Sequence, residues 1–314
     1  MSDGSRHQRV ATGEVVAGAE VVLDVAVLPP TSFGPRAVAA SAGPSLLLLA
    51  GLGAQRTEWP SELLDELRGA GVQVITLDNR DAGHSTVLPG PRIEVEQLRA
   101  AQAGVPVEPP YPLVALARDA LAVLDHLSLD RVHVLGRSMG GMVAQHLAAL
   151  APERIASLTI LSSTSGASDV GQPTDAAEEV LAAPVPAGRE EVIDAGVARA
   201  RVTGSRELFD EGRVRARLAQ RYDRSHRPDG TARQLLAILA DEDRTSLLRG
   251  LDVPTLVIHG DEDPLVTPSG GRAVAAAVPG ARFEEVAGMG HDLPVPLLPR
   301  IAALVLEQIL ATRS

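Results

Sequence analysis

The sequence predicts an α/β fold with a mostly parallel, doubly wound sheet of about eight strands and an inserted group of helices. Short apolar segments bounded by Gly, Pro or Asp alternate with segments of helical periodicity, as in a parallel sheet covered by helices. The alternation stops at Gly166 and returns after Arg249, and the residues between show helices and turns without a strand pattern. At 314 residues, the chain is long enough for one core with such an insertion.

Most predicted strands are continuous apolar runs, as expected of strands that are buried on both faces of a sheet. An antiparallel edge hairpin comes first, with strands Glu14–Ala17 and Val21–Leu28 around Gly18. The later strands are Leu46–Ala50, Val72–Leu77, Val132–Leu135, Ile155–Leu161, Val253–His259 and Arg282–Val286.

The clearest helix is Leu113–Leu127, which has Leu and Ala at 3.6-residue spacing and Arg118, Asp119 and Asp125 off that stripe. The other predicted helices of the core are Thr57–Gly69, Met142–Leu150, Gly270–Val278 and a closing amphipathic helix through Leu297, Ile301, Leu304 and Val305. We therefore expect a core domain formed by residues 1–165 and 250–314, with a helical cap at residues 166–249.

Composition and charge exclude several functions. The formal net charge is −11 and aromatic residues make up only 2% of the chain, so nucleic acid is not an expected partner. Neither Lys nor Cys occurs, which excludes Schiff-base chemistry, phosphate loops that end in Lys and thiolate zinc sites. The polar start Met1–Gly13 has no apolar leader, and no apolar run approaches the 18 residues of a membrane span. We expect a cytoplasmic protein that does not enter membranes.

A candidate nucleophile, Ser138, lies between the strand Val132–Leu135 and the helix Met142–Leu150. The sequence there is Gly136-Arg137-Ser138-Met139-Gly140-Gly141, a Gly-x-Ser-x-Gly motif in a strand-turn-helix context. Small neighbours are needed two residues on either side because the backbone passes close at such a turn. The N-terminus of the following helix favours an anion that forms beside the serine.

A serine nucleophile needs a base, and His291 is the best placed of the eight histidines. It lies in Gly288-Met289-Gly290-His291-Asp292, a loop after the last predicted strand, where a parallel sheet presents residues at its C-terminal edge. The histidines in strands and helices, His259 among them, are interpreted as packing or surface residues.

The acid that orients this histidine is expected after the strand Val253–His259. Three acids compete there, in Gly260-Asp261-Glu262-Asp263-Pro264. Asp263 is the first choice because Pro264 fixes its backbone, and Asp261 is the second. For the oxyanion, we expect backbone N–H donors from Met139 and from Leu52 in the glycine-rich loop after Leu46–Ala50.

Taken together, these stretches resemble the α/β-hydrolase superfamily, and within it the bacterial hydrolases related to aclacinomycin methylesterase. The other matching stretches are Gly51-Leu52-Gly53-Ala54-Gln55 with Trp59-Pro60 and Asp78-Asn79-Arg80-Asp81-Ala82-Gly83-His84-Ser85-Thr86. The chain order Ser138, Asp263, His291 is the one expected of this superfamily. The resemblance implies a serine hydrolase without cofactor or metal, and a helical cap after the sixth strand.

Three features depart from the common pattern of this superfamily. Ala50-Gly51 stands where His-Gly is frequent, Arg80-Asp81 stands where Arg-Gly is frequent after the fourth strand, and Arg137 beside the candidate nucleophile is larger and more charged than usual. Two interpretations of Arg137 stay open: an ion pair with an acid at the sheet edge, or a contact with substrate. The insertion also carries 12 of the 29 arginines between Arg199 and Arg249, against eight acids. This excess indicates either a solvated lid or arginines that favour an anionic substrate.

The sequence therefore predicts a carboxylic ester hydrolase that acts on a small or medium-sized ester through Ser138, His291 and Asp263. The same machinery would also suit C–C bond or thioester hydrolysis, a lyase or cyclase step, or a slow-turnover ligand-binding protein. Substrate identity, the state of the cap and the oligomeric state are open at this point.

Overall fold

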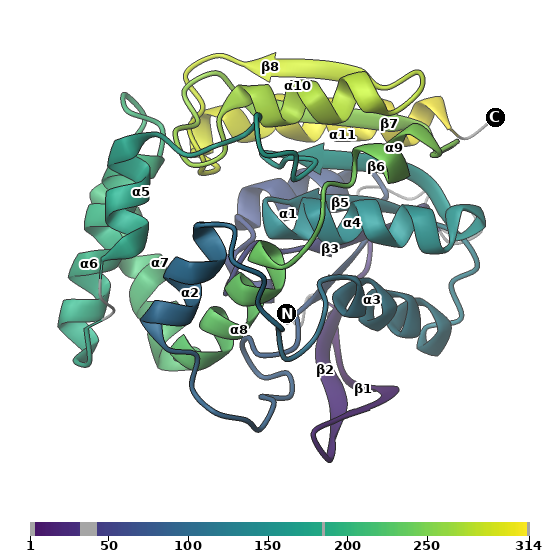
Figure 1. The fold of residues 1–314 in the computed structure, drawn as a ribbon. Coiled ribbons are helices and arrows are strands. Elements are labelled where there is room, and N and C mark those ends of the chain that lie inside the picture. Colours follow the sequence, from purple (N-terminus) through teal and green to yellow (C-terminus); the bar gives the residue numbers. More distant parts are fainter. Residues whose placement is uncertain (1–3, 32–42, 184–185, 313–314) are drawn as a thin grey trace.

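In the computed structural model, residues 4–31, 43–183 and 186–312 are described. Over this part of the chain, eight strands form one sheet in the order β1-β2-β4-β3-β5-β6-β7-β8 (Figure 1). The antiparallel strands β1 and β2 lead into β4, and the remaining neighbours are parallel. The bounds are β1 Arg6–Val16, β2 Ala19–Leu28, β3 Ser45–Leu49, β4 Gln73–Leu77, β5 Val132–Arg137, β6 Ile155–Leu161, β7 Thr255–Gly260 and β8 Arg282–Val286. The predicted α/β fold is confirmed.

The central strands are buried on both faces, and alternate residues enter two apolar clusters. In β3, Leu47 and Leu49 join one cluster and Leu46 and Leu48 the other, as the two-residue period of a strand requires. Three helices cover the first face: α3 Val114–His126, α4 Met139–Leu150 and α10 Pro268–Ala277. Two cover the second: α1 Ser61–Gly69 and α11 Leu298–Ala311.

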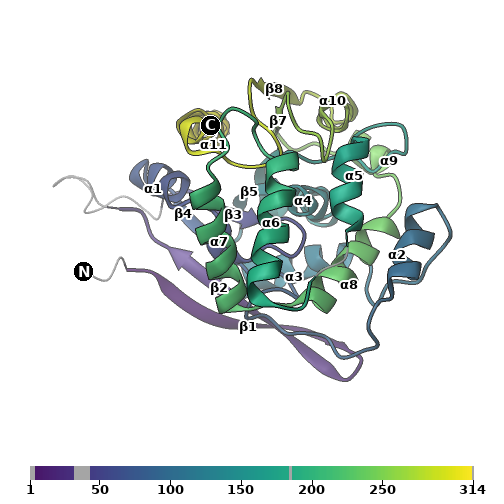
Figure 2. The ribbon, with the colours of Figure 1, turned by 90° about the vertical axis from the view of Figure 1, so that its left-hand side faces the viewer.

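The described residues between β6 and β7 form five helices, which we call, with their connecting turns, the α5–α9 segment. They are α5 Asp175–Ala182, α6 Arg189–Thr203, α7 Glu211–Arg224, α8 Pro228–Leu239 and α9 Thr245–Arg249. The described residues between β6 and β7 contain no strand, as the sequence predicts. In Figure 1, α5, α6 and α7 stand beside the edge of the sheet to which the β8 arrow points, and Figure 2 shows them in front of that edge.

Several predicted boundaries were wrong. The first strand begins at Arg6 instead of Glu14, because β1 pairs along the whole of β2, from Arg6 opposite Val27 to Val16 opposite Ala19. The predicted helix Thr57–Gly69 is a 3-10 turn and α1, separated at Pro60. The short helix α2, Val95–Gln102, was missed because its only buried residue is Ala101, which leaves little periodicity to detect.

Among the described residues, no helix is both long enough and apolar enough to cross a membrane.

Candidate active site

Ser138 lies at the sharp turn between β5 and α4. Its backbone has φ 54° and ψ −122°, a conformation that is unfavourable for a residue with a side chain. Two hydrogen bonds hold it: Ser138 N donates to the carbonyl of Leu161 at 2.9 Å, and Ser163 Oγ donates to the carbonyl of Ser138 at 2.8 Å. The neighbouring strand β6 and the residues after it therefore fix the position of Ser138.

Close backbone approaches explain the glycines on either side of Ser138. A Cβ on Gly136 would lie 2.2 Å from the carbonyl oxygen of Gly140. A Cβ on Gly140 would lie 2.0 Å from the carbonyl oxygen of Leu49. Neither position has room for a side chain, so the turn requires glycine at both.

The structure brings Ser138, His291 and Asp263 into one line of hydrogen bonds. His291 Nε2 is 3.0 Å from Ser138 Oγ, and His291 Nδ1 is 2.7 Å from Asp263 Oδ2. Asp263 Oδ1 accepts the N–H groups of Leu265 and Val266 at 2.9 and 3.0 Å, which fixes the carboxylate. These distances match those of a nucleophile, a base and a group that orients the base.

Of the three competing acids, only Asp263 contacts His291 in the described chain. Asp261 instead accepts the backbone N–H of Gly288 at 2.7 Å. Asp263 is 2% exposed. Burial raises the pKa of Asp263, but the charges and hydrogen bonds of His291 and His259 outweigh this, and the pKa falls well below its ordinary value. The carboxylate therefore stays ionised.

His259 is a neighbour of this site that sequence reasoning did not find. It lies in β7, is fully buried, and places Nε2 at 3.5 Å from Asp263 Oδ2 and 2.7 Å from the carbonyl oxygen of Val266. Because Nε2 donates to that carbonyl, it carries a proton. The only sequence signal was its place at the end of a strand, which it shares with ordinary core histidines.

The two expected oxyanion donors flank Ser138. A Cβ on Gly51 would lie 3.3 Å from Ser138 Cβ, so the loop that carries Leu52 lies against the candidate nucleophile. The N–H of Leu52 donates no hydrogen bond to any described residue. Met139 is the first residue of α4, so its N–H has no acceptor within the helix. Neither N–H group therefore has an acceptor among the described residues.

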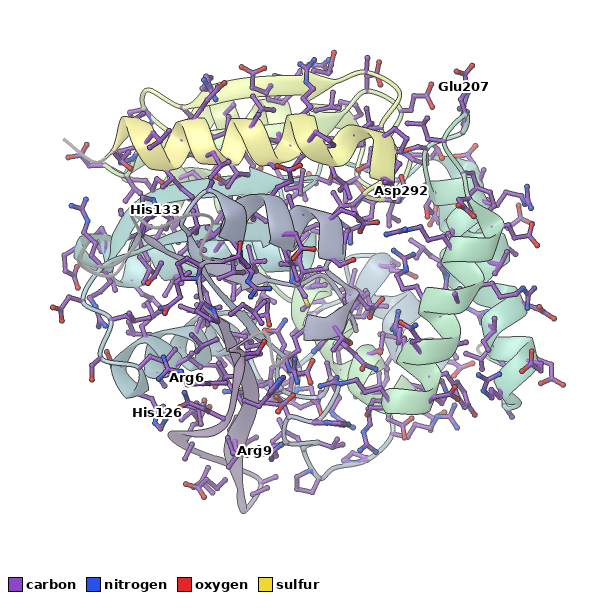
Figure 3. The ribbon with its side chains drawn as sticks, turned by 180° about the vertical axis from the view of Figure 1, so that it is seen from behind. Arg6, Arg9, His126, His133, Glu207 and Asp292 are labelled. Atoms are coloured by element: carbon purple, nitrogen blue, oxygen red, sulfur yellow. The ribbon has the colours of Figure 1, made fainter. Side chains whose placement is uncertain are left out.

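The α5–α9 segment contacts both functional loops. At the loop after β3, Gly53 N donates to Gln234 Oε1 in α8 at 2.8 Å. At the His291 loop, His291 N donates to the carbonyl of Thr203 and Gly290 N donates to Ser205 Oγ, both at 2.8 Å. Ser205 Oγ also donates to Asp292, which Figure 3 shows where this loop meets the α5–α9 segment.

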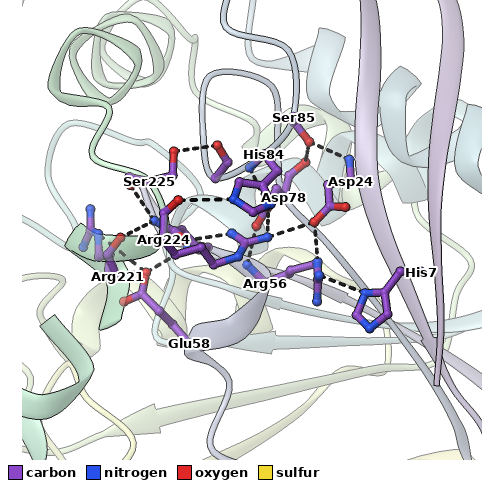
Figure 4. A network of polar contacts seen from close by, with 12 residues as sticks. His7, Asp24, Arg56, Glu58, Asp78, His84, Ser85, Arg221, Arg224 and Ser225 are labelled. Atoms are coloured by element: carbon purple, nitrogen blue, oxygen red, sulfur yellow. Dashed lines mark hydrogen bonds and ion pairs between the residues drawn. The ribbon is translucent and has the colours of Figure 1, made fainter. Parts of the chain in front are cut away.

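An ion-pair network joins the end of α7 to the core (Figure 4). Arg224 binds Asp24 at 2.8 Å and Asp78 at 2.7 Å, and it donates to Gln55 Oε1 at 2.7 Å. Arg56 binds the same oxygen of Asp24 at 2.6 Å. The network lies next to the loop that carries Leu52 and anchors the α5–α9 segment on that side.

Arg137 forms no ion pair with an acid in the described chain. Of the two interpretations of this residue, the ion pair at the sheet edge was therefore wrong. Its guanidinium instead donates to the carbonyl of His291. No group of three or more His, Cys, Asp or Glu side chains that could hold a metal occurs among the described residues.

Comparison with known proteins identifies the family. The model of the alpha/beta hydrolase fold family matches residues 44–295, and the chain belongs to this family. Over 282 residues the chain is 30% identical to rhodomycin D methylesterase DnrP of Streptomyces peucetius. The same identity holds for DauP of Streptomyces sp. strain C5, and each match covers 83% of this chain and 89% of the relative. These relatives support carboxylic ester hydrolysis as the enzyme activity.

Solved structures share the fold. An esterase from Thermogutta terrifontis has a TM-score of 0.71 at 22% identity, with 98% of this chain and 100% of that chain covered. An enol-lactonase from Burkholderia xenovorans LB400 has a TM-score of 0.69 at 23% identity, with 94% and 98% covered.

Proposed function

We propose that this chain hydrolyses a carboxylic ester of a small or medium-sized molecule, with Ser138 as nucleophile, His291 as base and Asp263 as the orienting acid. The observation that carries the proposal is the unbroken line of hydrogen bonds from Ser138 Oγ through His291 to Asp263, at 3.0 and 2.7 Å. The methylesterase relatives support an ester as the substrate.

In the proposed reaction, Ser138 Oγ attacks the ester carbonyl carbon while His291 Nε2 accepts its proton. The N–H groups of Leu52 and Met139 stabilise the negative oxygen of the tetrahedral intermediate. When the C–O bond breaks, His291 returns the proton to the departing alcohol, which leaves an acyl group on Ser138. Water then gives a proton to His291 and attacks the acyl carbon, and the acid departs as Ser138 Oγ regains the proton.

Asp263 supports both halves of this cycle. Its carboxylate accepts the Nδ1–H of His291, which leaves Nε2 free to accept the proton of Ser138. Because the pKa of Asp263 is low, the carboxylate remains negative beside the imidazolium that forms. Asp263 therefore both selects the useful tautomer and stabilises the positive charge.

We also propose that residues 166–249 act as a cap over a core formed by residues 1–165 and 250–314. The hydrogen bonds of Gln234 and Ser205 with the Leu52 and His291 loops support this assignment of a cap and a core, because they join the α5–α9 segment to the loops that carry the proposed reacting groups. The cytoplasmic location and the bacterial source stay predictions.

The test is a stopped-flow burst assay with 4-nitrophenyl acetate and butyrate. The unaltered chain should release a burst of 4-nitrophenol before steady turnover, because acylation of Ser138 precedes slower deacylation. Ser138→Ala should show neither burst nor turnover, and Ser61→Ala, an exposed serine in α1, should behave as the parent does. Turnover that survives in Ser138→Ala would disprove the assignment of the nucleophile. No burst in any of the three would favour a lyase or a binding protein.

A further inference from the structure

Arg137 lines a pocket beside the candidate nucleophile. Its side chain shares the pocket with residues of the Leu52 loop, the following turn and the His291 loop: Ala50, Gly51, Ala54, Gln55, Glu58, Trp59 and Leu293. One end of the guanidinium donates to the carbonyl of His291. The Nε–H of Arg137 is buried and has no hydrogen-bond partner in the described chain.

Arg217, in α7, places a second positive charge near enough to Arg137 to act on it. Its Nε is also buried, and Arg217 has neither a hydrogen bond nor an ion pair within residues 4–31, 43–183 and 186–312. Burial lowers the pKa of Arg137, and the positive charge of Arg217 lowers it further. Other arginines of α7 differ, since Arg213 and Arg215 are paired with Glu62 and Asp194.

The acids near Arg137 already have other partners. Asp292, Asp263 and Glu58 lie close enough to raise the pKa of Arg137, yet none of them is within ion-pair distance of it. Asp292 accepts from Ser205, and Asp263 accepts from His291. Glu58 accepts the N–H of Gln55 and pairs with Arg221, whose Nε lies 3.6 Å from it.

Trp59 adds a second donor to the pocket that Arg137 lines. It is the single tryptophan of the sequence and is 6% exposed. Its indole Nε1 is buried without a hydrogen-bond partner in the described chain. A buried N–H that lacks an acceptor is costly, and the cost is greater when the donor belongs to a guanidinium that forms no ion pair. An anion in this pocket would lie beside Arg137 and Trp59, and the nearby positive charge of Arg217 would favour it.

We propose that Arg137, Arg217 and Trp59 form a carboxylate-binding subsite, so that the preferred substrate is an ester that also carries a free carboxylate. This inference rests on the proposed ester hydrolysis and narrows its substrate class. A carboxylate fits because it accepts hydrogen bonds from the planar guanidinium with matching geometry. The ester carbonyl would lie at Ser138 while the carboxylate lies in the pocket beside it.

The first test compares two esters of equal acyl length, mono-4-nitrophenyl glutarate and 4-nitrophenyl pentanoate. We expect kcat/KM to favour the glutarate ester by about tenfold or more, as charge-assisted hydrogen bonds allow. Arg217→Gln should bring this ratio close to one. Arg215→Gln, an arginine of the same helix that is paired with Asp194, should keep it. Equal rates for both esters in the parent, or a ratio unchanged in Arg217→Gln, would overturn the subsite.

A second test does not depend on turnover, because Trp59 is an intrinsic fluorescent reporter of the pocket. Ser138→Ala is titrated with monomethyl glutarate and with methyl pentanoate. We expect a saturable change in emission with the glutarate ester only, and a weaker affinity when Arg217→Gln is added. If emission responds equally to both esters or to neither, the subsite is rejected. A parent chain that hydrolyses no ester but gives the glutarate titration would disprove the proposed function and leave the subsite standing.

Discussion

Gln234 in α8 accepts the backbone N–H of Gly53 through its side-chain oxygen at 2.8 Å. The other end of the same amide donates to the carbonyl of Arg80 at 2.7 Å. Gln234 is fully buried, so both bonds are sheltered from water. A residue of the α5–α9 segment thus sets the position of the loop that carries Leu52, the proposed oxyanion donor.

Replacing Gln234 by Leu should therefore lower kcat more than it changes KM. Without its acceptor, Gly53 is free to shift, and a small displacement of a catalytic group is expected to cost about tenfold or more in rate. Steady-state kinetics with 4-nitrophenyl butyrate provide the measurement. Gln220→Leu, at an exposed position of α7, is the control. A kcat in Gln234→Leu equal to that of the control would show that the loop holds itself in place.

Ser205→Ala should lower both stability and kcat. The change removes the acceptor of the buried Gly290 N–H and the donor to Asp292. Leaving buried polar groups unpaired costs about 1–3 kcal/mol in the free energy of unfolding. Urea unfolding and kcat are measured together, with Ser61→Ala as the matched serine control. An unaltered unfolding midpoint would contradict the contacts described for Ser205.

Arg224→Met should lower the free energy of unfolding by about 3 kcal/mol, because it leaves the fully buried carboxylate of Asp78 without its cationic partner. Arg213→Met is the comparison, since its pair with Glu62 is half exposed and worth at most about 1 kcal/mol. Chemical denaturation at neutral pH measures both. Equal losses in the two variants would mean that the network of Figure 4 contributes no more than a surface pair.

Asp263→Asn should lower the free energy of unfolding by an amount that depends on pH. The pKa of Asp263 is lower in the folded chain than its ordinary value near 4. A lowered carboxyl pKa stabilises the folded state above that ordinary value, and this contribution is lost as the pH falls below it. The difference in unfolding free energy between the parent and Asp263→Asn should therefore be larger at pH 7 than at pH 3. A difference that does not shrink in acid would contradict the shifted pKa.

The same substitution should reduce kcat by several orders of magnitude. An asparagine in place of the acid in a Ser-His-Asp site favours the wrong imidazole tautomer, with a loss of about 10⁴-fold in the best studied case. Asp261→Asn is the control, because Asp261 contacts Gly288 and not His291. Comparable activity of the two variants would remove Asp263 from the proposed mechanism.

Local sequence patterns were enough to predict the sheet and the approximate position of each buried strand. Strand β6 was predicted at its observed bounds, since Ile155–Leu161 is mostly apolar and holds only two buried polar residues, Ser157 and Thr159. The meeting of Ser138, Asp263 and His291 also followed from the sequence, because residues that follow parallel strands gather at one edge. Their catalytic roles stay predictions.

Contacts made across long stretches of chain were not predictable in the same way. Gln234 and Gly53 are 181 residues apart, and nothing near either residue marks the other as its partner. An ion pair with an acid was one of two interpretations of Arg137, yet its guanidinium donates to a backbone carbonyl, a partner that has no sequence signal. The length of β1 was missed because Val10 is its only fully buried residue, so the strand lacks an apolar pattern.

The hydrogen bonds of Gln234 and Ser205 have a consequence for chimeras made from this chain and a relative. A chimera that takes residues 166–249, the proposed cap, from a relative would also replace the acceptors of the Gly53 and Gly290 N–H groups. Grafts that retain a glutamine and a serine at these two positions should stay active more often than grafts chosen for pocket shape alone. If the proposed cap sets specificity, a change of cap therefore also changes the support of the two loops beside Ser138 and His291.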